Sequence, residues 1–164
     1  IHTNSATGAI PRLLDMGVEP FLLVSTLRVV VGQRLVRRLA DGKEQYVLGK
    51  AEREKVASED HFDAVMKALA EEKIVKTGTK IDAVPFYRPK TGSEAGDGYK
   101  SRIGIHEVLQ VTPTIREMIM KSATSDQLEE QARKEGMLTM LEDGMYKASR
   151  GITSLEEVLR AITE

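Results

Sequence analysis

The chain has no cysteine and no tryptophan, and phenylalanine and tyrosine make up only 4% of its 164 residues. The missing cysteines exclude disulfides, thiolate metal ligands and cysteine nucleophiles. No run of about 18 apolar residues occurs, which excludes a membrane-spanning helix. Because 41% of the residues are hydrophobic, we expect a soluble, intracellular protein of one domain or two small ones, with a real core.

An excess of either charge is also missing. Lysine and arginine number 24 and aspartate and glutamate 25, which gives a net charge of -1. A chain without an overall basic field is not expected to bind nucleic acid nonspecifically.

The sequence begins at Ile1 rather than at methionine, and the segment that follows has neither a basic n-region nor an apolar h-region. Residues 1–4 are typical of a strand end entering a polar turn. We therefore expect the chain to start inside a larger protein whose upstream part holds some of the active site.

Residues 1–40 predict two helices. The first begins near Ile10 and stops at Gly17, and the second begins at Pro20. The almost wholly apolar body of the second, residues 21–31, predicts a buried helix. Residues 33–39 fit either a continuation of that helix or a strand, and periodicity does not decide between them.

Residues 41–98 are polar and interrupted by glycine, so we expect an insertion or subdomain there. A helix is predicted over residues 59–73, and its apolar face is formed by Phe62, Val65, Met66 and Leu69. Residues 91–98 are rich in glycine and small polar residues and predict an exposed loop.

From residue 99 the pattern predicts one short strand and a compact bundle of short helices. Alternation over residues 101–106 indicates the strand, with Ile103 and Ile105 facing inward. Helix starts are predicted at Thr112 and at two capping boxes, Thr124 with Gln127 and Thr153 with Glu156. A methionine-rich helix is expected over residues 137–149. Together these patterns predict an α/β, helix-rich fold.

The three histidines are candidates for chemistry. We interpret His61 as a solvated surface residue, and His106 as a structural histidine at a strand end more readily than as a catalytic one. His2 stands beside Thr3 and Asn4 at the end of an apparent strand, where an α/β sheet commonly meets its ligand. Spacing alone still favours a structural turn there.

Metal and phosphate motifs are missing. No His-x-x-x-His, His-Glu-x-x-His or EF-hand spacing occurs. The glycine-rich segment 92–98 lacks Gly-Lys-Ser/Thr and carries two acidic residues that would repel phosphate. Without a Walker A loop, these residues do not form a complete nucleoside triphosphatase.

Arginines form the remaining candidate site. Arg34, Arg37 and Arg38 repel one another unless an anion or an acidic surface neutralises them. The cluster therefore fits a phosphate contact or a subunit interface as well as it fits a solvated surface. Arg102 on the predicted strand is a second candidate for such a contact. The methionines of the C-terminal helices are more typical of a core or a docking groove than of chemistry.

Several motifs, in order, resemble a known family. They are His2-Thr3-Asn4, residues 8–17, Glu19-Pro20-Phe21, residues 33–37, 98–100 and 102–108, Gly136-Met137, Glu142-Asp143-Gly144, and residues 151–154 and 157–160. The chain resembles the C-terminal domain of the ATPases that drive type II secretion and type IV pilus assembly. The resemblance covers about two-thirds of the chain and leaves out residues 41–95.

The resemblance implies an ATP- and magnesium-dependent, hexameric, cytoplasmic motor with a RecA-like P-loop domain and a C-terminal helical bundle. Residues 1–40 would end the RecA-like core, 41–98 would occupy the position of the family's zinc motif, and 99–164 would form the strand and bundle. The Walker A, acidic and Walker B segments would lie upstream of Ile1. The partners would be an inner-membrane platform protein and the pilus or secretion machinery, with no nucleic acid, and the motor would be peripheral to the inner membrane through them.

By the same resemblance, His2 is the box histidine that senses the terminal phosphate of ATP. Thr3, Asn4 and the four arginines would contact the nucleotide or a neighbouring subunit. Many family members hold zinc with two Cys-x-x-Cys pairs, but the corresponding positions here are Ala40, Lys43, Thr91 and Glu94. We therefore predict no zinc and expect the apolar face of the 59–73 helix to hold the middle segment together.

Two functions remain open at this point. The chain is either the C-terminal part of a motor ATPase, inactive alone, or a catalytically silent adaptor that binds a partner through its methionine-rich helices. A Walker A loop upstream of Ile1 would favour the motor. The sequence does not distinguish secretion, pilus extension and DNA uptake.

Overall fold

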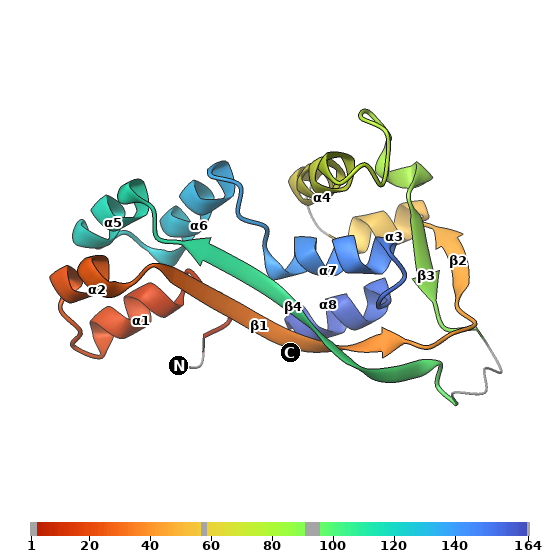
Figure 1. The fold of residues 1–164 in the computed structure, drawn as a ribbon, viewed down its shortest axis with the longest axis horizontal. Helices are drawn as coiled ribbons and strands as arrows, with labels where there is room; N and C mark the ends of the chain where they lie inside the picture. Colours follow the sequence, from red (N-terminus) through yellow and green to blue (C-terminus); the bar gives the residue numbers. More distant parts are fainter. Residues whose placement is uncertain (1–2, 57–58, 91–95, 164) are drawn as a thin grey trace. The chain divides into compact units, whose positions relative to one another are not determined.

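The computed structural model describes residues 3–56, 59–90 and 96–163 (Figure 1). The protein is α/β and helix-rich, as predicted, with two small sheets of two strands each among the described residues. It divides into two compact units, the first made of Ile1–Gln33 and His106–Met140, the second of Arg34–Ile105 and Leu141–Glu164. The division at residues 40 and 98 that composition suggested stays a prediction.

The elements follow one another as α1 (Ala9–Asp15), α2 (Pro20–Thr26), β1 (Val29–Leu39), β2 (Glu44–Val47), α3 (Lys50–Lys55), α4 (Glu59–Glu71), the 3-10 turn η1 (Ile81–Ala83), β3 (Pro85–Arg88), β4 (Tyr99–Gln110), α5 (Pro113–Met120), α6 (Ser125–Lys134), α7 (Met140–Ser149) and α8 (Leu155–Thr163). Strand β1 pairs with β4, and β2 pairs antiparallel with β3. The boundaries between the two units fall within β1 and β4, so each of these strands contributes to both units.

The first unit has one core between its helices and its part of the β1–β4 sheet. Its buried residues come from α1, α2, α5, α6, the end of β4 and the segments just before α1 and just after β4: Ala6, Ile10, Leu23, Leu109, Val111, Ile115, Ile119, Leu128 and Ala132. Val30 packs against this cluster, which places one face of β1 toward it. Because both segments of the unit supply core residues, neither can form this core alone.

The second unit has a separate core that joins its middle segment to the C-terminal helices. The buried residues are Leu48, Val56, Phe62, Val65, Leu69, Val84, Phe86, Met145, Ala148 and Leu155. The predicted helix 59–73 is confirmed as α4, and Phe62, Val65 and Leu69 are buried as expected, with Met66 packed beside them. The apolar face of α4 is thus part of what holds the middle segment together.

The predicted buried helix over residues 21–31 is wrong in extent and in burial. Helix α2 ends at Thr26, and β1 begins at Val29. Only Leu23 is buried in the helix, whereas Phe21 is 68% exposed and Leu22 52%. The hydroxyl of Thr26 donates to the Leu22 carbonyl at 2.6 Å, and the β-branched valines that follow favour a strand. The open alternative for residues 33–39 is resolved as a strand.

Helix starts and stops were predicted more accurately. Gly17 and Gly136 follow α1 and α6 with positive φ, and the Thr112 hydroxyl accepts the Ile115 amide hydrogen at 3.2 Å. Both arms of the Thr124–Gln127 capping box are present. These signals are local, so they survive in the folded protein.

Three other predictions need correction. The strand expected over 101–106 extends over Tyr99–Gln110, and the methionine-rich helix begins at Met140 rather than at 137. Helix α8 begins at Leu155, so Ser154 and not Thr153, where the capping box was expected, stands at the N-cap position, and the Thr153 hydroxyl donates to the Arg37 carbonyl at 2.7 Å. Ser154 accepts the Glu157 amide hydrogen instead, at 3.3 Å.

The loop predicted over residues 91–98 lies mostly outside the described residues. Gly96 and Asp97 are exposed, as expected, whereas Gly98 is buried. In the described part of the chain, no helix combines the length and the apolar character needed to cross a bilayer.

Candidate functional site

The N-terminal candidates lie in the first unit. His2 falls outside the described residues. The Thr3 hydroxyl donates to the Ser5 carbonyl at 2.9 Å, and Asn4 is exposed and makes a further interaction. The Ser5 hydroxyl in turn accepts the Gly8 amide hydrogen at 3.0 Å. Local hydrogen bonds therefore order the turn that follows His2.

A buried carboxylate on β4 anchors this turn. Glu107 Oε1 accepts the Ala6 amide hydrogen at 2.7 Å, across 101 residues of sequence. Burial raises the pKa of Glu107, and hydrogen bonds from the backbone of Ala6, Met140 and Thr7 oppose that rise. Sequence patterns predicted no role for Glu107 beyond its place in the family motif. It fixes the segment that carries Thr3 and Asn4 to β4.

The arginine candidates lie in the second unit, and the structure brings only some of them together. Arg37 from β1 and Arg102 from β4 line a cavity of about 490 Å³ with Leu35 and Arg160. Arg34 and Arg38 do not line it; Arg38 is exposed, and Arg34 is half-buried with an interaction of its own.

Arg37 is held by acids on two sides. Its Nη2 donates to Glu157 Oε1 at 2.6 Å, and its Nη1 donates to Asp97 Oδ2 at 2.7 Å. The guanidinium carbon lies 4.2 Å from the centre of the Tyr99 ring, within cation–π range. The hydrogen bond to Glu157 raises the pKa of Arg37 despite a partial burial that acts to lower it.

Glu157 is the centre of this cluster. It is buried, it accepts the Arg37 amide hydrogen at 2.9 Å, and Arg160 Nη2 donates to it at 3.0 Å. Burial alone would raise the pKa of Glu157, but the hydrogen bonds from Arg37 and Arg160 outweigh it and lower the pKa to about 2. The carboxylate is therefore ionised at neutral pH.

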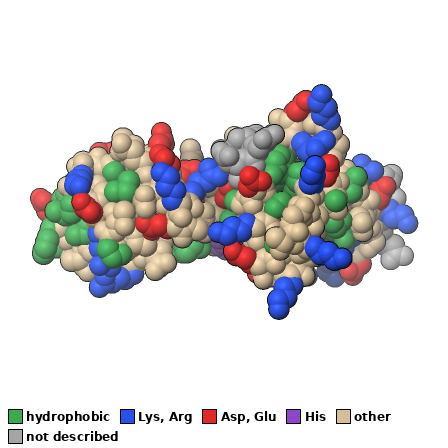
Figure 2. Space-filling model, turned by 90° about the horizontal axis from the view of Figure 1, so that it is seen from above, with side chains coloured by type: hydrophobic (Ala, Val, Ile, Leu, Met, Phe, Trp, Pro, Cys, Tyr) green, Lys and Arg blue, Asp and Glu red, His purple; other side chains and the backbone are tan. Residues whose placement is uncertain are grey.

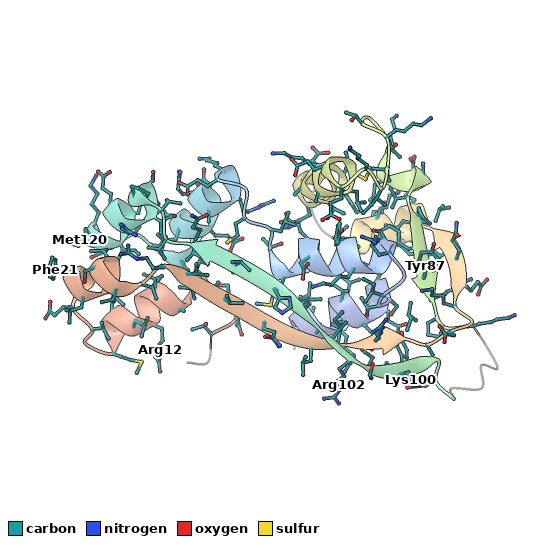
Figure 3. All side chains as sticks on the ribbon, viewed as in Figure 1. Arg12, Phe21, Tyr87, Lys100, Arg102 and Met120 are labelled. Carbon is teal, nitrogen blue, oxygen red and sulfur yellow. The ribbon has the colours of Figure 1, made fainter. Side chains whose placement is uncertain are left out.

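The charge available to an external anion is smaller than the arginine count suggests. Arg37 is neutralised by two carboxylates, while Arg160 shares Glu157 with it. Arg102 is exposed and has no hydrogen-bond or ion-pair partner among the described residues. Figure 3 shows it extending away from β4. The cavity thus presents Arg102, and part of Arg160, to a phosphate or a carboxylate.

Sequence reasoning missed Arg160, Glu157 and Tyr99 as members of this cluster. The first two form an i,i+3 pair on the predicted last helix, and that spacing was the available signal. Nothing in the sequence indicated that the pair would face β1.

Two histidines differ from their predicted surroundings. His61 was expected to be solvated, but it is largely buried and its Nδ1 lies 2.9 Å from Oε1 of Glu142, which is fully buried. His106 lies inside β4 rather than at the end of a strand; it is half-buried and makes an interaction. Both are integrated into the fold, and neither belongs to the arginine cavity.

The positions predicted to have lost zinc ligands are only partly described. The Ala40 amide donates to the Gly98 carbonyl at 3.0 Å, and Lys43 Nζ donates to the Gly151 carbonyl at 2.7 Å. Thr91 and Glu94 lie outside the described residues. Over the described ranges, no three or more His, Cys, Asp or Glu side chains gather as a metal site would require.

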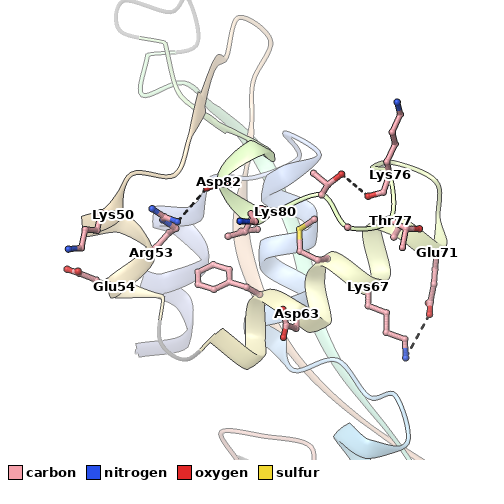
Figure 4. A pocket seen from close by; sticks show the side chains of 16 residues that line it. Lys50, Arg53, Glu54, Asp63, Lys67, Glu71, Lys76, Thr77, Lys80 and Asp82 are labelled. Atoms are coloured by element: carbon pink, nitrogen blue, oxygen red, sulfur yellow. Dashed lines mark hydrogen bonds and ion pairs between the residues drawn. The ribbon is translucent and has the colours of Figure 1, made fainter.

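A cavity of about 1220 Å³ lies between α3, α4 and the loop that precedes η1 (Figure 4). Phe62, Met66, Ala70 and Ile81 give it an apolar part. Its charged residues have both signs, and Arg53 and Asp82 approach to 4.0 Å across it. Figure 2 likewise shows both signs of charge interspersed over the face it presents. Neither the charges nor the lining residues indicate a particular chemistry.

Comparison with known proteins identifies the family to which the chain is similar. A family described as Type II/IV secretion system protein matches residues 1–160. Type II secretion system protein E of Xanthomonas campestris is 40% identical over all of this chain, which covers 26% of that protein. The type IV pilus assembly ATPase PilB of Pseudomonas aeruginosa is 38% identical over 98% of the chain, which covers 25% of it.

Type II secretion system ATPase E of Vibrio cholerae is 39% identical over the whole chain, which covers 29% of that protein. The chain therefore spans less than a third of the length of these relatives and corresponds to a part of them. The match extends across both compact units and across the middle segment that the motif resemblance left out. The chain belongs to the Type II/IV secretion system protein family.

Proposed function

We propose that this chain is the C-terminal part of a hexameric motor ATPase that powers type II protein secretion or type IV pilus assembly. The observation that carries the proposal is the family match over residues 1–160, together with relatives named as ATPases of these two systems. In this proposal the chain ends a RecA-like P-loop domain and adds its C-terminal helical bundle, while the Walker segments belong to the rest of the polypeptide.

ATP and magnesium would be bound by the full-length protein, and His2 would sense the terminal phosphate. Support for this role comes from the ordered turn after His2, which Glu107 ties to β4. A histidine on such a turn can report loss of the phosphate as a movement of the loop. Thr3 and Asn4 would contact the nucleotide from the same turn.

Among the arginines, we assign Arg102 to a subunit interface or to nucleotide phosphate, because it is exposed and has no partner among the described residues. Arg37 would serve by holding β1 to α8, since two carboxylates already neutralise it. Arg34 and Arg38 remain candidates for subunit contacts.

The motor would be cytoplasmic and would reach the inner membrane through a platform protein and the pilus or secretion machinery. No contact with nucleic acid is proposed. Zinc is not proposed either, and stoichiometric zinc in the purified full-length protein would contradict this. The second candidate function is an adaptor of the same fold without catalysis, which the paired state of Arg37 would suit.

Steady-state ATP hydrolysis by the full-length protein with magnesium tests the proposal. We expect turnover by the full-length protein, none by the 164-residue chain, and a loss of turnover on His2→Ala without a loss of thermal stability. Arg12→Ala is the matched control, because Arg12 is an exposed residue of the nearby helix α1. Absence of turnover in the full-length protein would favour the adaptor, and unchanged turnover in His2→Ala would remove the sensor role.

A further inference from the structure

Exposed apolar side chains gather in the first unit. Of the ten large hydrophobic residues that are exposed in the described part of the chain, seven belong to it: Met16, Phe21, Leu22, Val29, Val31, Val108 and Met120. Figure 3 shows Phe21 on α2 and Met120 on α5 directed outward from their helices. The strands β1 and β4 carry the three valines, and their two faces can be distinguished.

One face of these strands is covered by the unit's own helices. Val30 and Leu109 pack in the core, and a Cβ at Gly32 would lie 3.2 Å from the Ala6 backbone nitrogen, which donates to Glu107. Even positions of β1 and odd positions of β4 therefore face the helices. Because side chains alternate along a strand, odd positions of β1 and even positions of β4 form the opposite face.

The opposite face, here called the valine face, carries three exposed valines and no Lys, Arg, Asp or Glu. In the first unit its positions are Val29, Val31, Gln33, His106, Val108 and Gln110. Val29 is 48% exposed, Val31 55% and Val108 49%. No lysine, arginine, aspartate or glutamate occupies these six positions. A charged partner would find no countercharge there, whereas an apolar partner would bury the valines, with about 25 cal/mol gained for each Å² removed from water.

The sequence of β1 also fits a strand covered on both faces. Val29, Val30 and Val31 are a continuous apolar run, which is typical of strands in the interior of layered α/β sheets and not of strands with one solvated face. Helices are the elements that cover such sheet faces. The described helices of the first unit supply one covering layer, and the valine face indicates a second.

We propose that the valine face docks an apolar, uncharged helix from the part of the full-length polypeptide that lies outside these 164 residues. The size of the relatives supports this occupant, because the chain covers only 17–29% of them and most of the family's polypeptide is available to cover the face. The proposal rests on the fragment status of the chain and not on its catalysis. A second copy of this chain is the competing occupant.

Photo-crosslinking in the full-length protein tests the proposal. Val31 is replaced by p-benzoylphenylalanine, and the adducts are mapped by mass spectrometry after irradiation. We expect intramolecular adducts, in the band of monomer mass, to peptides outside residues 1–164. A probe at Val108 should reach the same peptides, because it lies on the same face.

Glu130 is the matched control position, since it is exposed on α6 in the same unit and pairs with Lys134. Adducts from Val31 and Val108 to residues 1–164 of a second copy, or yields no higher than from Glu130, would overturn the proposal. ATP hydrolysis is measured on the same samples. If the protein hydrolyses ATP but gives none of the expected adducts, the docking proposal is rejected and the proposed function is not.

Discussion

Glu157 balances two guanidinium groups at the contact between β1 and α8. Its carboxylate has its pKa lowered from an ordinary value of 4.5 to about 2, because Arg37 and Arg160 donate to it despite its burial. An acid with a lowered pKa in the folded state stabilises that state fully above its unfolded pKa. The stabilisation is lost as pH falls from about 4.5 toward about 2.

We predict that Glu157→Gln lowers the free energy of unfolding at neutral pH, by about 2 kcal/mol, because Arg37 and Arg160 lose a buried anionic partner. The difference from the wild type should narrow as pH falls from about 4.5 toward about 2, because the wild-type carboxyl is protonated first in the unfolded state and only near pH 2 in the folded state. Urea titrations across this range measure it. Arg102→Ala is the control from the same cavity and should leave stability unchanged. A difference independent of pH would contradict the assignment.

At the residue scale, the sequence indicated which residues could be functional, but not which side chains they contact in the folded protein. Arg37 and Arg102 were separate candidates in the sequence, and the structure places both at one cavity, while their functional roles stay predictions. The neutralisation of Arg37 could not be predicted, because Glu157 lies 120 residues away and Asp97 lies 60 away. Burial of His61 against Glu142 was missed for the same reason: sequence spacing contains no information about contacts across 81 residues.

At the scale of elements, α7 and α8 pack closely at Gly144. A Cβ placed at Gly144 would overlap the side chain of Val158, whose Cγ2 would lie 2.9 Å away. Val158 is fully buried, so its branched side chain has little space into which it can move. Glycine is therefore required here by the neighbouring helix and not by a turn.

We predict that Gly144→Ala destabilises the protein by about 1–3 kcal/mol through overpacking, although alanine is the better helix former by about 1 kcal/mol. Adding Val158→Ala should recover part of the loss, because it removes the overlapping methyl groups. Thermal unfolding of the two single variants and the double variant gives the coupling. A stabilised Gly144→Ala, or strictly additive effects, would count against close packing.

Elements with local signals were predictable, and those decided by pairing were not. The capping box at Thr124 and the stops at Gly17 and Gly136 depend on neighbours within a few residues, and they are correct. The apolar run 21–31 divides into a helix and a strand because its second half pairs with β4. The partner residues lie about 80 positions away, since the Val111 amide donates to the Arg28 carbonyl at this end of the sheet, and no periodicity in a short window includes them.

At the scale of the whole molecule, the α/β class and the family were predictable, because helix patterns and ordered motifs extend along the chain. The two compact units were not, since each combines two distant segments. The core of the first unit uses no residue beyond Met137, whereas the core of the second uses Met145, Ala148 and Leu155.

This difference predicts the effect of removing residues 141–164. The first unit should keep its amide protection in α5 and α6, because its core residues all remain. The second unit should lose protection in β2 and β3, because three of its buried core residues are deleted. Hydrogen exchange of the truncated and intact chains, compared by mass spectrometry, checks both halves of the prediction. Loss of protection throughout would mean that the two units unfold as one.

The interleaving of the two units has a consequence for synthesis on the ribosome. Residues 34–105 are made before residues 106–140 return to the first unit, and residues 141–164 then return to the second. Neither core can close until a late segment has emerged, so a nascent chain synthesised as far as residue 105 exposes apolar side chains intended for two cores. Strand β1 is then an unpaired edge, because its partner β4 (Tyr99–Gln110) is not yet complete, and at this stage a holding chaperone would protect the chain most.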